Sequence, residues 1–440
     1  MVEKQSQCRG GRVTIACGRR RRSRRTPVVL DLIAIGSQLR LHRVSLASRR
    51  HCSGMVAGNH TVRLDRQLTE MPNGTPRWSR AVTPEAHFIT LCTREAEAVP
   101  EAQWRAACAA VSDWDRVVTT ADDHRVTAFV RRGAARGATL LPADAERGLR
   151  GDVLIRWTLT KQLSAMLIRS VAALVAAQVP VIVLKGPALA ATIYPAAGLR
   201  PYDDIDLVVQ AGDDDAAAAA LRDCGLVEGS FDAEVRRRAH GGHLHDAAYH
   251  RVFRSQNEQL MIELHADPLQ LGLATTCEAG RWERAQPVAG LPGALMLGWE
   301  DQIVQLSVHA HKHGFSRLIW LKDLDLLLRR QAVNWDLVAR VARAEGVTAS
   351  VWCTLEHSAA VLGSPVPPAA LARFRPAALT RALYRRLWPL ERTAALDGHM
   401  RRRAVQFHAA ESWRGMVPSL VLMGRRRERC QAIFSAVFQR

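Results

Sequence analysis

The chain has 440 residues, of which 48% are hydrophobic and 23% are charged. This length and composition exclude a wholly disordered or fibrous protein and predict a globular one with two or three domains. The net charge of +19 lies mainly at the two ends: residues 1–55 hold thirteen basic and two acidic residues, and residues 401–440 hold nine and two, so the part between them carries only +1. A near-neutral body disfavours an obligatory polyanionic partner.

Residues 1–70 are predicted to be a basic, disordered arm, or sequence upstream of a misassigned start at Met55 or Met71. The arm contains the run RRRRSRR at 19–25. No aromatic residues are interleaved there for base stacking, so nucleic acid is a possible but not a favoured partner. Residues 396–440 are predicted to be a second basic tail.

Residues 83–178 are expected to form a helical region. Apolar residues recur every three or four positions over 114–132, and a long helix is predicted for 152–178, ending before Pro180. No stretch supplies about 18 uninterrupted apolar residues, so no membrane-spanning segment is expected. Nine scattered cysteines without C-x-x-C spacing fit reduced thiols and a cytoplasmic protein.

Residues 179–290 are expected to form an α/β core. Strands are predicted at 181–185 and 204–209, and a hairpin at 249–254 and 260–266. Alternation along the second hairpin strand places Glu263 on the face opposite Leu264.

Asp204 and Asp206 stand two residues apart at the start of a predicted strand, so their side chains share one face. Two carboxylates held together repel each other unless a cation lies between them. The pattern therefore predicts a divalent-metal site, although acids at strand ends are also commonly solvated surface charges.

Residues 291–395 are expected to form a helical domain. His309 and His313 would lie on one face of a helix there, at a spacing that zinc sites use, but no H-E-x-x-H motif is present. Histidines that line a cleft or pack in the core are favoured over zinc ligands. Asp323 and Asp325 are interpreted as ordinary helix charges.

Several segments together resemble the uncharacterised nucleotidyltransferase family of the DNA polymerase beta superfamily. They are LKG at 184–186, LRPYDDIDLVV at 199–209, IELH at 262–265 and EDQIVQLSVHAHKHGFSRLIWLKDLDLLL at 300–328. The resemblance implies an α+β fold: a small mixed sheet flanked by helices, with helical N-terminal and C-terminal regions.

The resemblance also implies the site residues. Asp204 and Asp206 would be paired metal ligands and Glu263 the third catalytic carboxylate, while Lys185 and Gly186 would form the turn that approaches the nucleotide phosphates. Arg200 would contact a phosphate, with a helix-end or surface role left open. Two Mg²⁺ ions and a nucleoside triphosphate (NTP) are the implied cofactor and substrate.

The chain departs from the superfamily pattern at three places. Pro187 stands where Gly or Ser is usual, the interval from Gly186 to Asp204 is long, and the third acid is Glu263 where Asp is common. The expected function is metal-dependent transfer of a nucleoside monophosphate from an NTP to an unknown acceptor. The alternative is a catalytically inactive module of the same fold that binds a nucleotide or a protein partner.

Overall fold

The computed structural model describes residues 82–135, 141–196, 198–229, 251–257, 259–270 and 280–396. All of them lie in the second of two compact units, Met1–Thr75 and Pro76–Arg440. The expected basic arm at 1–70 and nearly all of the basic tail at 396–440 fall outside the described residues.

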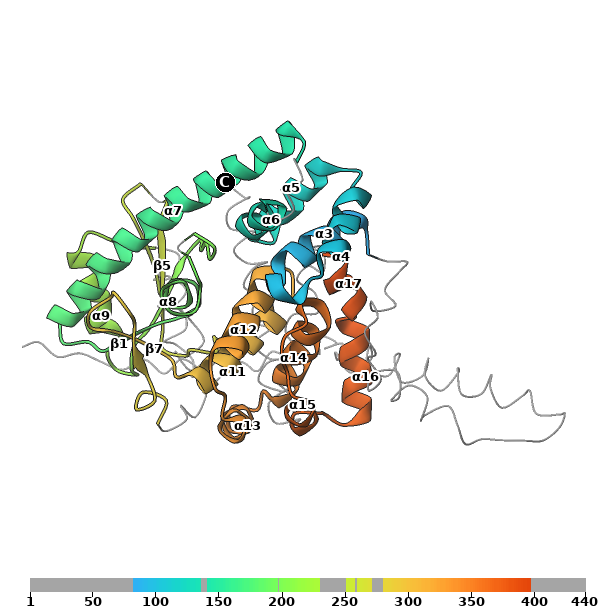
Figure 1. Cartoon of the computed structure of the whole chain (residues 1–440). Coiled ribbons are helices and arrows are strands. Elements are labelled where there is room, and N and C mark those ends of the chain that lie inside the picture. Colours follow the sequence, from blue (N-terminus) through green and yellow to red (C-terminus); the bar gives the residue numbers. More distant parts are fainter. Residues whose placement is uncertain are drawn as a thin grey trace, which may run out of the picture. The chain divides into compact units, whose positions relative to one another are not determined.

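Helices dominate both ends of the described chain, and the strands of one sheet lie between them in the sequence (Figure 1). The N-terminal helices are α3 (Pro84–Thr93), α4 (Glu101–Ala110), α5 (Trp114–Asp123), α6 (Thr127–Ala134) and α7 (Ala143–Ala176). The C-terminal helices are α11 (Trp299–Lys312), α12 (Leu318–Arg330), α13 (Trp335–Ala344), α14 (Thr348–Leu362), α15 (Pro368–Arg373), α16 (Ala378–Leu387) and α17 (Leu390–Ala394).

The sheet has seven strands in the order β3-β4-β5-β2-β1-β7-β6 among the described residues. They are β1 (Val181–Val183), β2 (Ile205–Val208), β3 (Val227–Glu228), β4 (Arg251–Arg254), β5 (Met261–His265), β6 (Gln286–Pro287) and β7 (Ala294–Met296), with α8 (Lys185–Thr192) after β1 and α9 (Asp214–Asp223) after β2. β2 pairs antiparallel with β1 and parallel with β5, so the sheet is mixed. The predicted α+β class is confirmed.

The predicted hairpin is confirmed as well, because β4 and β5 pair antiparallel with Arg254 opposite Met261. The helical spacing over 114–132 corresponds to two helices rather than one. Arg125, between α5 and α6, has φ of +59°, a left-handed conformation that ends the first helix.

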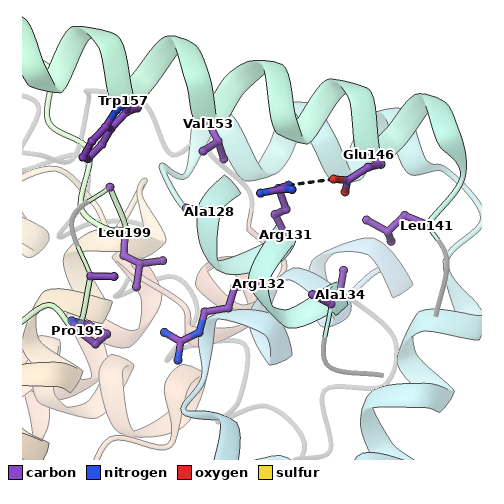
Figure 2. A pocket seen from close by; sticks show the side chains of 13 residues that line it. Ala128, Arg131, Arg132, Ala134, Leu141, Glu146, Val153, Trp157, Pro195 and Leu199 are labelled. Carbon is purple, nitrogen blue, oxygen red and sulfur yellow. Dashed lines mark hydrogen bonds and ion pairs between the residues drawn. The ribbon is translucent and has the colours of Figure 1, made fainter. Parts of the chain in front are cut away.

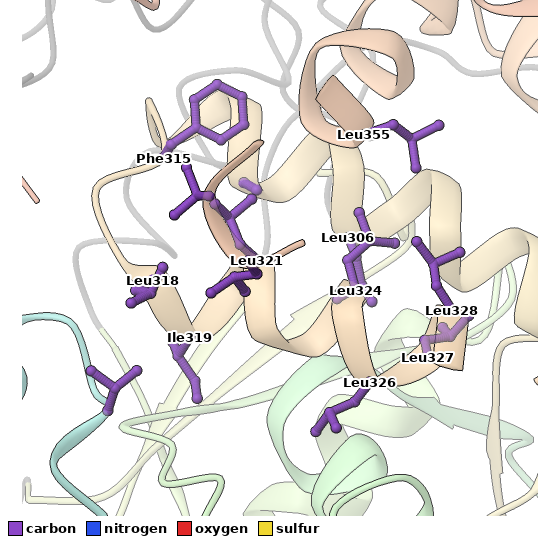
Figure 3. Packing of buried hydrophobic residues seen from close by; sticks show 14 of the residues in the cluster. Leu306, Phe315, Leu318, Ile319, Leu321, Leu324, Leu326, Leu327, Leu328 and Leu355 are labelled. Atoms are coloured by element: carbon purple, nitrogen blue, oxygen red, sulfur yellow. The ribbon is translucent and has the colours of Figure 1, made fainter. Parts of the chain in front are cut away.

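Two large hydrophobic cores and a third cluster of four buried residues organise the described elements. The larger one joins the N-terminal helices to the C-terminal helices, with Phe88 and Leu355 among its fully buried members. Figure 3 shows part of this core, where leucines of α11 and α12 meet Leu355 of α14. The smaller core lies between α7, α9 and the sheet.

Helix α7 takes part in both cores. Leu149 near its start belongs to the helical core, whereas Leu163 and Leu174 belong to the core beside the sheet. The sequence predicted no spanning segment, yet α7 is long and apolar enough to cross a membrane, and 39% of its most apolar window is buried. One such helix is weak evidence for a span, because core helices of globular proteins meet the same criterion.

Candidate functional site

Three acidic residues meet at two adjacent strands. Asp206 of β2 lies directly opposite Glu263 of β5 in the parallel register, and Asp204 immediately precedes β2. The alternate residues Ile205 and Leu207 are fully buried in the core beside the sheet. Burial of one face fixes which residues of β2 are available on the other.

The carboxylates strongly influence one another. Burial, and then the charge of Asp206, raise the pKa of Asp204 to about 6, with a further increase from Glu263. Burial alone would also raise the pKa of Asp206, but Lys185 and His265 hold it well below its usual value. Asp206 is thus ionised at neutral pH, while Asp204 experiences negative charge that its surroundings do not fully compensate.

Both oxygens of Asp206 have partners. Oδ1 accepts a hydrogen bond from Gln270 Nε2 at 2.7 Å and lies 3.0 Å from His265 Nε2, while Oδ2 lies 3.0 Å from Lys185 Nζ. The Asp206 side chain is only 6% exposed. It is therefore held in one orientation by residues from three separate segments.

Asp206, Glu263 and His265 form the group with metal-ligand potential among the described residues. One ligand atom from each lies within 4.8 Å of the others, and His265 Nε2 is 3.4 Å from Glu263 Oε2. Carboxylate oxygens and an imidazole nitrogen are ordinary ligands of divalent cations. With the uncompensated charge at Asp204, this donor set fits a divalent cation.

Lys185 and Gly186 lie at the start of α8, directly after β1. Lys185 has φ of +50°, a conformation that costs energy for a residue with a side chain, and its ammonium points to Asp206. Gly186 packs against Tyr202: a Cβ at position 186 would come within 2.7 Å of the Tyr202 Cβ. Glycine at position 186 is therefore explained by packing against Tyr202, in addition to its expected role in approaching a phosphate.

Arg200 is buried and bound within the protein. Its Nε and Nη2 donate to Asp323 Oδ1 and Oδ2 at 2.7 and 2.8 Å, and Nη1 donates to the Pro201 carbonyl at 2.6 Å. Tyr194 Oη also donates to Asp323, at 2.6 Å. Phosphate binding by Arg200, as expected from the sequence, would require this network to break. Asp323 is likewise no ordinary helix charge, since it is fully buried.

Asp203, the neighbour of Asp204, is held by three arginines. Arg125 Nε and Arg156 Nη1 each bind it at 3.0 Å, and Arg317 Nη1 binds it at 3.2 Å. Arg156 also binds Asp122 of α5 at 2.8 Å. These contacts fix the segment just before β2 to the N-terminal helices and to the start of α12.

The end of α11 also reaches the site. Lys312 Nζ lies 3.3 Å from both the backbone oxygen and the side-chain Oε1 of Gln270. The rings of His309 and His313 are 4.6 Å apart and both contact Trp320, while neither belongs to the group with metal-ligand potential in the described chain. His309 is half-buried and His313 is exposed, so neither is packed in the core, and both rings lie against Trp320.

Sequence reasoning missed His265, Gln270 and Lys312 as members of the site. His265 had a detectable signal, because it alternates with Glu263 on one strand. Gln270 and Lys312 had none: Gln270 reaches Asp206 from the segment after β5, and the packing of α11 brings Lys312 to Gln270.

A cavity of about 730 Å³ lies elsewhere, between α6, α7 and the segment 195–199 (Figure 2). An ion pair at its rim joins Arg131 Nε to Glu146 Oε1 at 3.0 Å, and Trp157 and Leu199 line it. Its lining residues do not include Asp204, Asp206 or Glu263.

Comparison with known proteins gives one match. The family described as "Uncharacterised nucleotidyltransferase" matches residues 110–363, which include every candidate site residue described above. No curated protein and no solved structure matches the chain significantly.

Proposed function

Because the chain belongs to the uncharacterised nucleotidyltransferase family, we propose that it transfers a nucleoside monophosphate from an NTP to an acceptor in a reaction that depends on Mg²⁺. The observation that carries this proposal is the register of β2 and β5, which sets Asp206 opposite Glu263 with Asp204 two residues away. The family assignment supports nucleotidyl transfer in general. The NTP donor, the dependence on Mg²⁺ and the roles of the individual residues are our proposal.

Asp206 and Glu263, with Asp204, would hold the divalent cation. Such a cation, when bound, stabilises the negative charge that develops on the phosphate oxygens during transfer. Binding of a cation at Asp206 requires Lys185, His265 or Gln270 to give up part of its contact with that carboxylate.

The transfer exchanges one phosphorus–oxygen bond for another. An acceptor oxygen forms a bond to the α-phosphorus while the bond to the β-phosphate oxygen breaks, and pyrophosphate leaves. The acceptor proton must go to a nearby base, and Glu263, which is 22% exposed, is a carboxylate that an acceptor can reach. Lys185, 3.0 Å from Asp206, supplies positive charge next to the reacting phosphate.

A second candidate function is a nucleotide-binding module without turnover. The observation that favours it is the full set of contacts at Asp206, whose two oxygens already bind three side chains. A site closed in this way binds a metal only if these contacts exchange. Turnover is what separates the two functions.

The test is to incubate the full chain with Mg²⁺ and each α-labelled NTP in the presence of cell extract, and to measure pyrophosphate and labelled product. The product is then sorted into protein, RNA and small-molecule fractions. We expect Asp206→Asn to lower transfer at least about a hundredfold, because one cation-binding carboxylate is removed. Asp144→Asn is the matched control, since that side chain is 82% exposed at the start of α7.

Equal transfer by Asp206→Asn and the unsubstituted chain would overturn the assignment of the site. Metal-dependent NTP binding that Asp206→Asn weakens, without turnover in any fraction, would favour the binding module instead.

A further inference from the structure

Two lysines from distant elements converge on one amide oxygen beside Asp206. Lys185 Nζ, from the start of α8, lies 3.0 Å from Gln270 Oε1, and Lys312 Nζ, from the end of α11, lies 3.3 Å from the same atom. The two residues are 127 positions apart in the sequence. Their meeting is therefore a product of the tertiary fold.

The two ammonium groups at this point differ in their partners. Lys185 is paired with Asp206 at 3.0 Å, whereas Lys312 donates hydrogen bonds to two oxygens of the uncharged Gln270. Burial, and then the charge of Lys185, lower the pKa of Lys312 to about 8. The nearby carboxylates of Asp206, Asp267 and Glu263 oppose this shift. An anionic oxygen placed between the two ammonium groups would interact with them more strongly than the neutral amide oxygen does.

Gln270 bridges the cations and the carboxylate. Its Oε1 faces Lys185 and Lys312, while its Nε2 donates to Asp206 Oδ1 at 2.7 Å. It has φ of +55°, an unfavourable backbone conformation for glutamine. Gln270 Oε1 thus occupies a position between two ammonium groups that suits an anionic oxygen. Gln270 Nε2 occupies a neighbouring position that suits a hydrogen-bond donor to the Asp206 carboxylate.

We propose that Lys185 and Lys312 together bind the polyphosphate of the NTP, and that a phosphate oxygen takes the position held by Gln270 Oε1 in this structure. Lysine suits this role, because its compact ammonium binds phosphate oxygens as a point charge. The inference deepens the proposed function, since it names the residues that bind the leaving pyrophosphate part of the donor, but its test does not require transfer.

The experiment measures the binding of inorganic tripolyphosphate and of ATP to the full chain by calorimetry, without divalent cations. We expect Lys312→Met to weaken the binding of both by about tenfold or more, because a charge-assisted hydrogen bond is lost. Lys312→Arg, which keeps the charge, should recover most of the affinity. Lys161→Met is the matched control, because that ammonium lies over the Trp157 ring on α7.

A second variant tests the role of Gln270. Gln270→Gly removes the bridging amide and suits the positive φ, so it should bind tripolyphosphate at least as tightly as the unsubstituted chain. Unfolding curves of each variant establish that it is folded. Unchanged tripolyphosphate affinity in folded Lys312→Met, an equal loss in Lys161→Met, or no tripolyphosphate binding by the unsubstituted chain would each overturn the proposal.

The results also separate this inference from the proposed function. Lys312-dependent binding of tripolyphosphate without transfer from any NTP would support the inference and count against the enzyme. Transfer that depends on Asp206, with tripolyphosphate affinity unchanged in Lys312→Met, would support the enzyme and overturn the inference.

Discussion

At the scale of single residues, the pKa values of buried histidines in this protein depend on their hydrogen-bond partners. His265 is buried beside two carboxylates: burial lowers its pKa, but hydrogen bonds to Asp206 and Glu263 raise it above the usual value. His124 is equally buried without a carboxylate partner, and burial lowers its pKa to about 4. The surroundings of the two side chains therefore shift their pKa values in opposite directions.

His124 is bound as a neutral ring. Its Nδ1 accepts a hydrogen bond from the Leu318 backbone N–H at 3.1 Å, and its Nε2 donates to the Leu396 carbonyl at 3.2 Å. Because the pKa in the folded state lies below the ordinary 6.5, the unfolded state binds the proton first as the pH falls. The stability that His124 contributes is fully present above pH 6.5 and is lost as the pH falls toward 4.

We therefore expect the free energy of unfolding to fall between pH 7 and pH 5, with about 2 kcal/mol of that loss due to His124. In His124→Asn, whatever its stability at pH 7, the loss between the two pH values should be smaller by that amount. Denaturant unfolding of both proteins at each pH measures the difference. Burial also lowers the pKa of His357, to about 3. Because His357 is present in both proteins, its contribution cancels when they are compared. The same pH dependence in both proteins would contradict the role of His124.

At the scale of elements, buried ion pairs fasten the segment between α8 and β2 to the helices around it. Asp323 of α12 accepts hydrogen bonds from Arg200 and Tyr194, and it is fully buried. Asp203, three residues beyond Arg200, is bound by Arg125 and Arg156. The segment that leads into Asp204 is thus fixed from two sides.

Removal of one member of the Arg200–Asp323 pair should be strongly destabilising. Asp323→Ala leaves the buried guanidinium of Arg200 without its charge partner, and we expect a loss of about 3–5 kcal/mol in the free energy of unfolding. The double variant Arg200→Leu/Asp323→Leu should recover a large part of that loss, because no buried charge is left unpaired.

Denaturant unfolding of Arg200→Leu, Asp323→Leu and the double variant gives the coupling energy. Additive losses would show that the pair is not coupled. If the double variant recovers stability but not NTP binding, Arg200 also contributes to NTP binding. This result would agree with the phosphate contact that the sequence predicts for Arg200.

At the scale of the whole molecule, the larger part of the excess basic charge and the candidate site belong to different units of the chain. The unit Met1–Thr75 holds most of the excess basic charge, a net +11 of the total +19, while every site residue belongs to Pro76–Arg440. Basic arms bind polyanions through counterion release, and such binding weakens steeply as the salt concentration rises. Nucleic-acid affinity and nucleotidyl transfer should therefore be separable.

Deletion of residues 1–75 tests this separation. We expect the shortened chain to keep its affinity for tripolyphosphate and any NTP turnover, and to bind single-stranded RNA at least about tenfold more weakly at low salt, with a shallower salt dependence. RNA titrations at several salt concentrations, beside the tripolyphosphate calorimetry, measure both properties. A parallel loss of both would contradict the separation.

Much of the fold could be predicted from local patterns. The β4–β5 hairpin, the long helix before β1 and the helices α11 and α12 follow from alternation and helical periodicity, which depend on nearby residues alone. Boundaries were less accurate: α7 begins at Ala143 rather than 152. The break at Arg125 was missed, because a left-handed residue leaves no mark on the spacing of apolar residues.

The sequence by itself determined the family and the α+β class through the resemblance of its motifs, which also implied Lys185 as a site residue. Strand alternation indicated Asp204, Asp206 and Glu263, because it encodes which residues of a strand share a face. The tertiary structure alone decided that Gln270 binds Asp206, that Lys312 binds Gln270 and that Arg200 binds Asp323. Partners of this kind come from elements far apart in the chain. Their meeting depends on how the helices pack against the sheet, which no local pattern specifies.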